Sequence, residues 1–231
     1  MSNFPKRMVV ATLPAVMALL VNTSSGAFIN GVEQFDGTTL DATTWTPSIP
    51  ASSTITQNNE LIITGPARYT TNGIAIKVGD TVSADVKILV NSTGASTEAH
   101  FTLVNPGVDE WSFAYSGGRS AFYLFHFTPP GGGGSGWFSY SHNTSAFTLQ
   151  MQRLSSTSLQ IAAISGGAQL FSNTINTGAM ANDLSISLAL RGSGQISFDN
   201  IRIIPEPSTA ALIAMGVLTL CATRRRHTGG P

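Results

Sequence analysis

Short runs of alternating apolar and polar residues fill the chain between residues 28 and 204, and each run is closed by Gly, Asn, Ser or Pro. Apolar residues spaced two apart lie on one face of a β-strand, whereas an amphipathic helix needs apolar residues three and four apart. In residues 184–190, for example, every even position is Leu or Ile. Helical spacing is nearly absent from the same stretch. The pattern therefore predicts an all-β domain.

The alternation places about a dozen strands in this domain. A sheet with one dry face must bury that face, so this number of strands predicts two packed antiparallel sheets. Asn58 and Asn59 tolerate positive φ and indicate a hairpin turn between two of the strands. The expected strands are residues 54–56, 61–63, 81–90, 99–104, 111–115, 121–127, 136–141, 146–152, 158–164, 169–175, 184–190 and 195–204.

The strand expected at residues 121–127 differs from the others because it is apolar or aromatic on both faces. Phe122, Leu124 and His126 alternate with Tyr123, Phe125 and Phe127. We therefore expect a central strand that is covered by the core on one side and by a ligand or a loop on the other.

Three groups of residues carry a family resemblance. They are Phe35-Asp36-Gly37 with Leu40-Asp41 and Trp45, residues 59–63, and Phe198-Asp199-Asn200-Ile201. These segments resemble the opening and closing strands of concanavalin A-like jelly-roll domains, a superfamily that includes laminarinase-type glycoside hydrolases, laminin-G-like modules and lectins. The resemblance implies a two-sheet antiparallel jelly-roll sandwich with its first and last strands side by side. The segment around Phe35 should then neighbour the segment around Phe198.

A second resemblance lies near the C-terminus. Pro205, Glu206 and Pro207 precede an apolar run at residues 210–222, and Arg224, Arg225 and Arg226 follow it. This order resembles the PEP-CTERM sorting signal of bacterial envelope proteins, and implies that a membrane-embedded exosortase processes the chain. The apolar run has about thirteen residues, fewer than the roughly 20 that a spanning helix needs, and we expect a short apolar helix. The arginines should stay on the cytoplasmic side, which orients the body outward.

An export signal is predicted at the N-terminus. Lys6 and Arg7 precede an apolar stretch at residues 8–21, and Ser25-Gly26-Ala27 offers small residues for cleavage after Ala27. The chain thus divides into a signal peptide with its helix (1–27), a β-sandwich domain (28–204) and the sorting signal (205–231). The single cysteine, Cys221, lies in the sorting signal.

These signals predict the route of the protein. Signal peptidase and exosortase are the expected processing partners. The expected location is the cell envelope, the cell surface or the extracellular space, with transient or permanent membrane anchoring through the C-terminal segment.

Charge excludes one class of partner. Residues 28–204 hold seven basic and eleven acidic side chains, a net charge of about −4, so the domain has no electrostatic footprint for nucleic acid. Charged residues make up 10% of the chain, against about 25% in an average soluble domain. A surface rich in hydroxyl and amide groups is typical of secreted β-sandwiches that work among polysaccharides.

The acidic residues do not form a known catalytic motif. Laminarinase-type enzymes carry Glu-x-Asp-x-x-Glu on one strand, and this pattern is missing from the sequence. Asp109 and Glu110 are adjacent, so they face opposite sides of a strand. We therefore predict a non-enzymatic surface or matrix protein that associates with extracellular polysaccharide. The alternatives are a glycoside-active enzyme with carboxylates on separate strands, and a structural matrix subunit without a sugar site.

Aromatic side chains are the candidate sugar contacts, because their faces stack on the apolar faces of sugars. The candidates are Trp111, Tyr123, Trp137 and Tyr140. Trp45 is expected in the core, as its place in the jelly-roll resemblance implies, and His126 is interpreted as structural.

No cofactor is expected apart from a candidate structural Ca²⁺. Sugar-binding jelly rolls often hold calcium near the first and last strands, and Glu33, Asp36 and Asp199 lie where such ligands would meet. The alternative is that Asp36 and Asp199 cap turns.

Overall fold

The computed structural model describes residues 31–71, 74–92, 97–105, 107–127, 135–181 and 183–205, and for residues 135–138 it describes the backbone alone. The predicted signal helix, the loop at residues 131–134 and the sorting signal beyond Pro205 lie outside these ranges. Among the described residues no helix is long and apolar enough to cross a membrane. The described part consists of strands joined by turns and loops.

Fifteen strands make up this part of the chain. They are β1 (Val32–Glu33), β2 (Trp45–Ser48), β3 (Thr54–Gln57), β4 (Leu61–Thr64), β5 (Ala67–Thr71), β6 (Thr81–Asn91), β7 (Glu98–Asn105), β8 (Asp109–Ser116), β9 (Ala121–Phe127), β10 (Ser135–Ser141), β11 (Ala146–Arg153), β12 (Ser158–Ser165), β13 (Ala168–Asn176), β14 (Ser185–Arg191) and β15 (Gly194–Ile204).

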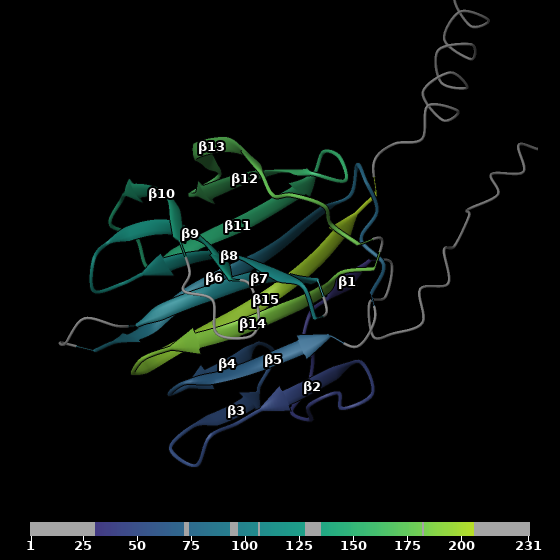
Figure 1. Cartoon of the computed structure of the whole chain (residues 1–231). Coiled ribbons are helices and arrows are strands. Elements are labelled where there is room, and N and C mark those ends of the chain that lie inside the picture. Colours follow the sequence, from purple (N-terminus) through teal and green to yellow (C-terminus); the bar gives the residue numbers. More distant parts are fainter. Residues whose placement is uncertain are drawn as a thin grey trace, which may run out of the picture.

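The strands form two antiparallel sheets, which Figure 1 shows stacked face to face. Sheet A has the order β13-β12-β11-β6-β15-β4-β3, with β1 paired to β15, and sheet B has the order β10-β9-β8-β7-β14-β5-β2. Neighbours such as β6 and β11, or β7 and β14, are far apart in sequence. The predicted two-sheet antiparallel sandwich is confirmed.

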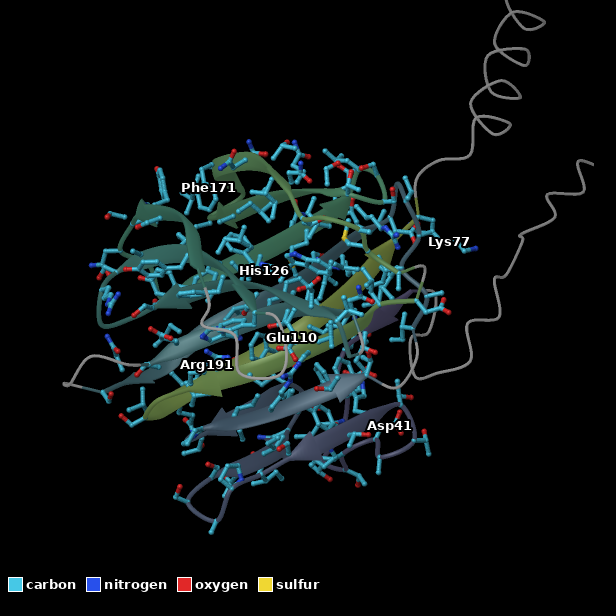
Figure 2. The ribbon with its side chains drawn as sticks, in the orientation of Figure 1. Asp41, Lys77, Glu110, His126, Phe171 and Arg191 are labelled. Atoms are coloured by element: carbon cyan, nitrogen blue, oxygen red, sulfur yellow. The ribbon has the colours of Figure 1, made fainter. Side chains whose placement is uncertain are left out.

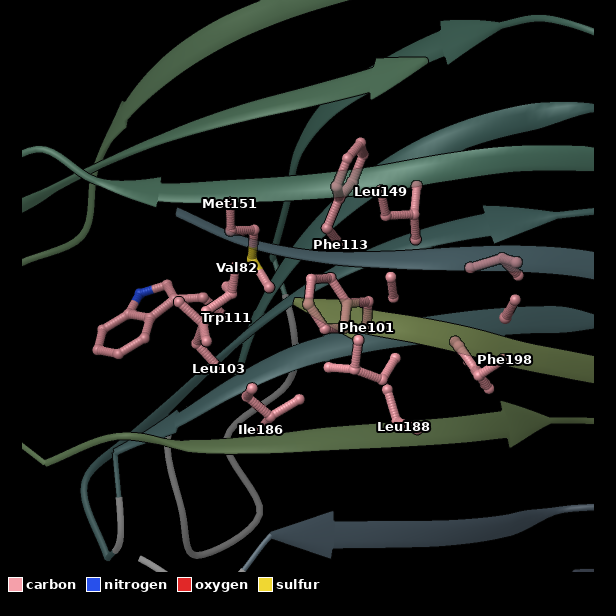
Figure 3. Packing of buried hydrophobic residues seen from close by; sticks show 14 of the residues in the cluster. Val82, Phe101, Leu103, Trp111, Phe113, Leu149, Met151, Ile186, Leu188 and Phe198 are labelled. Carbon is pink, nitrogen blue, oxygen red and sulfur yellow. The ribbon is translucent and has the colours of Figure 1, made fainter. Parts of the chain in front are cut away.

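The core lies between the sheets and takes one side chain in two from most strands. Phe101, Phe113 and Leu188 of sheet B meet Leu149 and Phe198 of sheet A, and all five are fully buried (Figure 3). These residues are the apolar members of the alternation, so the period of two decided which side chains face inward. Trp45 is also buried, and its ring stacks on Tyr69 with centroids 5.0 Å apart.

The first and last strands of the domain are neighbours, as the jelly-roll resemblance implied. Val32 and Glu33 of β1 pair with Arg202 and Ile201 of β15. The register of β15 on β6 shifts between Asp199 and Arg202, where Asn200 has φ of 49°. The expected hairpin turn also forms between β3 and β4, with Asn59 at φ of 56°.

The expectation that residues 121–127 form a central strand is corrected. β9 is next to the edge of sheet B, between β8 and β10. Phe122 and Leu124 are buried in the core, whereas Tyr123, Phe125 and Phe127 are half-buried on the outer face. The second aromatic face therefore belongs to the surface of sheet B.

Candidate functional site

The outer face of sheet B carries two rows of side chains that run across five strands. The strand register places Ser187, Thr102, Ser112 and Phe125 side by side in one row. The next row contains Ala189, His100, Ala114 and Tyr123. Arg68 and Thr70 of β5 extend the rows at one end. This face is thus polar on β5, β14, β7 and β8 and aromatic on β9.

Two long contacts indicate that this face is concave. Arg68 of β5 reaches Glu110 of β8 across β14 and β7, with Nη1 3.0 Å from Oε1. Arg191 of β14 lies over the ring of Phe127 of β9, with Cζ 4.4 Å from the centroid, across β7 and β8. Three inter-strand gaps amount to about 14 Å in a flat sheet. Both contacts form because the curvature of the sheet makes the side chains converge.

A hollow of about 180 Å³ opens where these side chains converge. Figure 2 shows Glu110 and Arg191 over the same part of the sheet. The volume is below the roughly 300–1,000 Å³ of drug-sized pockets, and suits one small polar unit of a larger ligand. The groups that line the hollow with a side-chain donor, acceptor or ring are Ser48, Arg68, His100, Thr102, Glu110, Ser112, Phe127, Ser187 and Arg191.

A chain of hydrogen bonds runs along the floor of the hollow from Thr102 through Ser112 to His100, and continues beyond it to Glu98. His100 Nε2 is 3.3 Å from Glu98 Oε2, and His100 Nδ1 is 2.7 Å from Ser112 Oγ. Burial lowers the pKa of His100, so the ring is neutral. The hydrogen bond with His100 lowers the pKa of Glu98, which is therefore an ionised acceptor. Nε2 must then carry the proton, so Nδ1 accepts from Ser112, whose oxygen accepts from Thr102.

Three half-buried rings form a row on β9 at the rim of this face. The ring centroids of Tyr123 and Phe125 are 5.9 Å apart, and those of Phe125 and Phe127 are also 5.9 Å apart. The His100 ring stacks on Phe125 at 5.9 Å. Arg119, in the turn between β8 and β9, lies 5.8 Å from the centroid of Tyr123. We call Tyr123, Phe125 and Phe127 the aromatic row.

The predicted sugar contacts are only partly brought to this face. Tyr123 belongs to the aromatic row. Trp111 is fully buried on the opposite face of β8, where its ring stacks on His126. The prediction that Trp111 contacts a sugar is therefore wrong. Tyr140 packs against Phe171 and the core edge. The side chain of Trp137 lies outside the described residues.

The candidate calcium ligands do not converge in the described structure. Glu33 is 8% exposed, and its oxygens accept from the Phe35 amide at 2.9 Å and the Trp45 indole at 3.4 Å. Burial raises the pKa of Glu33. The Asp199 carboxylate accepts a hydrogen bond from the Asn200 amide at 2.7 Å. At Asp36 the backbone carbonyl, and not the carboxylate, accepts a hydrogen bond from the Gln57 side chain. In the described ranges no three His, Cys, Asp or Glu side chains are grouped to hold a metal ion.

Most residues of the site were absent from the sequence-based candidates, namely Arg68, Glu98, Ser112, Phe125, Phe127 and Arg191. One signal was available for the central part. In residues 98–102 the alternation puts Glu98, His100 and Thr102 on one face of a single strand, which is an unusual concentration of functional groups. Arg68 of β5 and Arg191 of β14 join the site only because of the strand order, which no local sequence pattern indicates.

The carboxylates of this face are widely spaced. Glu98 pairs with Ser116, and Glu110 pairs with Val104, so the two glutamates are offset by six residues along the strands. Their Cα atoms are therefore about 20 Å apart in that direction. Paired glycosidase carboxyl groups lie about 5–9.5 Å apart. Asp109 is engaged by His126 Nε2 at 2.7 Å. Among the described residues, Glu98 is thus the ionised carboxylate that the buried histidine positions at this face.

A second hollow, of about 370 Å³, lies on the outer face of sheet A, where Asp85 and Asp199 are directly opposite each other. Asp85 accepts from Thr148 Oγ1 at 2.7 Å and is 3.6 Å from Arg202. Burial raises the pKa of Asp199. Phe147 is the only aromatic residue lining this hollow, and it is 5% exposed. It therefore lacks the ring surface that the outer face of sheet B offers.

Comparison with known structures shows the fold. No protein-family model matches this sequence, and no curated protein matches it. A glycosyl hydrolase family protein from Mycobacterium fortuitum is 15% identical, with a TM-score of 0.53 over 75% of this chain and 98% of its own. A β-1,3-glucanase from Mycobacterium marinum is 14% identical, with a TM-score of 0.52 over 78% and 100%. Porphyranase B from Zobellia galactanivorans is 12% identical, with a TM-score of 0.53 over 76% and 91%.

These likenesses correct one prediction. The absence of the short acidic motif led us to expect a non-enzymatic protein, and this expectation is wrong, because proteins of the same architecture include a glucanase and a porphyranase. A motif of three residues on one strand is too narrow a criterion to separate this chain from that group. The described chain has the jelly-roll fold of these glycoside hydrolases.

Proposed function

We propose that this protein is a carbohydrate-active jelly-roll protein that holds a polysaccharide along the concave outer face of sheet B and hydrolyses glycosidic bonds there. The observation that carries the proposal is the continuity of the polar hollow with the aromatic row on one concave face. Aromatic faces stack on the apolar faces of sugar rings, and convergent polar groups bind their hydroxyls.

The aromatic row and the polar hollow would bind different parts of the polysaccharide. The aromatic row offers three rings in succession, which fits several consecutive sugar units. The hollow offers the partly exposed Arg68 guanidinium and Glu110 carboxylate, which fit the hydroxyls of one unit. The Ser112 and Ser187 hydroxyls are buried in its floor and hold the polar side chains in place. The donors and acceptors of the hollow are already ordered by hydrogen bonds to one another, so little side-chain entropy is lost on binding.

Glu98 is the proposed reacting carboxylate: it takes a proton from the water that attacks the anomeric carbon, the glycosidic C–O bond breaks, and the departing oxygen takes its proton from solvent. Its lowered pKa keeps it ionised near neutral pH, as a nucleophile or general base in glycoside hydrolysis must be. His100 fixes the orientation of this carboxylate through its Nε2 proton and acts as a positioning residue. Arg119 and Arg191 contribute to the ionised state through their positive charges.

Binding is tested by affinity electrophoresis of the full-length chain in gels that contain a β-glucan, a galactan, an alginate or a mucin. We expect retardation in at least one gel, and its loss in Phe125→Ala. Gln150→Ala, on the outer face of sheet A, is the control and should migrate like the wild type. Equal migration of the wild type in all gels and in a gel without polysaccharide would overturn the proposal.

Hydrolysis is tested on the polysaccharide that is retained, by the release of reducing ends and the fall in polymer length. Glu98→Gln should bind the polymer but release at least 100-fold fewer ends. An unchanged rate in Glu98→Gln contradicts the role of this carboxylate, and no release by the wild type contradicts hydrolysis while leaving binding in place.

We also propose that the protein is exported and sorted to the cell surface by an exosortase. The support is the order of residues 205–226, which follow β15 directly, together with the predicted signal at residues 1–27. Mass spectrometry of the protein isolated from its cells tests this. A mature form that begins near Phe28 and lacks Cys221 is expected, and a form that retains Cys221 would show that the C-terminal segment is a permanent anchor.

A further inference from the structure

Two exposed arginines lie over the ends of the aromatic row. Arg119 is above Tyr123, with Cζ 5.8 Å from the ring centroid, and Arg191 is above Phe127 at 4.4 Å. In the described part of the chain neither guanidinium takes part in a salt bridge. A guanidinium over a ring is held in place by the cation–π attraction and keeps its donor edge free for a ligand.

The charge of this face is opposite to that of the domain. The described residues contain seven basic and eleven acidic side chains, a net charge of −4. Arg68, Arg119 and Arg191 are on the outer face of sheet B or the turn that borders it, and Glu98 and Glu110 are the acidic side chains of the described strands on this face, which gives a net charge of +1. Asp109 of β8 is on the opposite face, beside His126. Glu110 is engaged by Arg68. An acidic domain thus presents three of its seven basic groups where the proposed ligand binds.

In the part of the chain that is described, Glu98 forms no salt bridge with either of the two arginines. Its carboxylate is bonded to His100, and both guanidiniums act on it only as charges at longer range that lower its pKa. Tyr123 and Phe127 are four residues apart on one strand, so their Cα atoms are about 13 Å apart. A single small anion cannot reach both ends of such a row, whereas a polymer with repeated anionic groups can.

We propose that the ligand of this face is an acidic polysaccharide, whose sulfate esters or carboxylates are bound by Arg119 and Arg191 while its sugar rings contact the parts of the aromatic row that the two guanidiniums leave uncovered. This inference rests on the proposed function and names its ligand class. The planar fork of a guanidinium matches both kinds of oxyanion and binds either through two parallel hydrogen bonds. A neutral polysaccharide would use the rings and leave both guanidiniums without an anionic partner.

The test compares matched polymers in binding to the full-length chain. A sulfated galactan is paired with its desulfated form, and an alginate with its uncharged ester, so that each pair differs in charge alone. At 50 mM NaCl we expect at least one charged polymer to have a Kd at least 10-fold lower than its uncharged partner. The preference should weaken at 500 mM NaCl, because salt screens exposed charges. The pair that shows the preference distinguishes sulfate from carboxylate.

Variants locate the charge recognition. Arg119→Gln with Arg191→Gln should reduce the preference for the charged polymer over its uncharged partner to less than 3-fold. Arg202→Gln removes a half-buried positive charge from sheet A and should leave the preference unchanged. Both arginines are exposed, so the double variant should fold, which its circular dichroism and unfolding midpoint will verify.

Each remaining outcome is decisive. Equal affinity of the wild type for charged and uncharged partners overturns the inference and leaves the proposed function standing. Retention of the preference by the double variant overturns the role of the two arginines. Failure to bind every polymer overturns both the inference and the proposed binding function.

Discussion

Arg68 and Glu110 form a bifurcated ion pair across the outer face of sheet B, with Arg68 Nη1 3.0 Å from one carboxylate oxygen of Glu110 and 3.1 Å from the other. The pair bridges strands that are separated by two others. It therefore exists only while the sheet is curved, and it reports on the shape of the proposed binding face.

The contribution of this pair to stability should be small. The Arg68 and Glu110 side chains are 34% and 21% exposed, so water screens their attraction. In a double-mutant cycle of Arg68→Met and Glu110→Gln, we expect a coupling of about 1 kcal/mol or less. Urea unfolding measures the four free energies. A coupling several times larger would mean that the pair is desolvated, and the concave face closed to ligands.

Acidification should destabilise the fold through His100. Its folded pKa lies below the ordinary value of 6.5, so the unfolded chain takes up a proton first as the pH falls. Stability should therefore decrease below about pH 6.5. Glu98 adds to the loss below its ordinary value of 4.5, because its folded pKa is also lowered. The urea midpoint between pH 8 and pH 4 measures both effects.

The matched variant for this effect is His100→Asn, which keeps a polar group beside Ser112. It should cost about 1–3 kcal/mol at pH 8, since the bond to Glu98 is lost. It should also flatten the decline between pH 7 and pH 5. A variant that declines as steeply as the wild type would assign the pH dependence to other groups.

The buried arginine at the end of β11, in sheet A, should be hard to replace. Arg153 is 1% exposed and donates to the carbonyls of Ile76 at 2.7 Å, Met180 at 3.2 Å and Ser155 at 3.4 Å. Lysine cannot reproduce this fork, so Arg153→Lys should lower the free energy of unfolding by about 1.5–3 kcal/mol. Arg202→Lys, on the surface, should change it by less than about 0.5 kcal/mol. Similar losses in both variants would contradict the anchoring role of Arg153.

The first residue of β15 should not tolerate a side chain. Gly194 has φ of 114°, and a Cβ there would lie 2.5 Å from the Val90 carbonyl oxygen and 2.5 Å from Thr97 Oγ1. Gly37 also has positive φ, 88°, but a Cβ there has nothing within 4 Å. Gly37→Ala should therefore cost about 1–2 kcal/mol from backbone strain alone, and Gly194→Ala about 1–3 kcal/mol more. Equal costs would mean that the steric contact relaxes freely.

Sequence periodicity predicted most strands because most of them place alternate apolar side chains in the core. The short strand β1 carries too few residues for alternation. β2 contains Pro47, which an edge strand tolerates and a central strand does not, and β5 has only Ala67 and Tyr69 as apolar residues. These three strands were therefore missed.

The site was less predictable than the fold for a different reason. Trp111 and Tyr123 are both aromatic residues on strands, yet one is in the core and the other on the surface. Which face of a strand is the inner one depends on its neighbours. The Arg68–Glu110 and Arg191–Phe127 contacts depend further on strand order and sheet curvature, which no local pattern contains. Only the polar face of residues 98–102 and the two-sided aromatic pattern of residues 121–127 had a local signal.

The position of β15 has a mechanical consequence. This strand ends at Ile204, directly before Pro205, and it lies inside sheet A, with β6 on one side and β4 and β1 on the other. A force applied to the residues after Pro205 along the strand would load the hydrogen bonds on both sides in shear, so that they resist together. At an edge strand pulled sideways, the same bonds would open one after another. The domain is therefore built to bear tension through the segment that connects it to its proposed anchor.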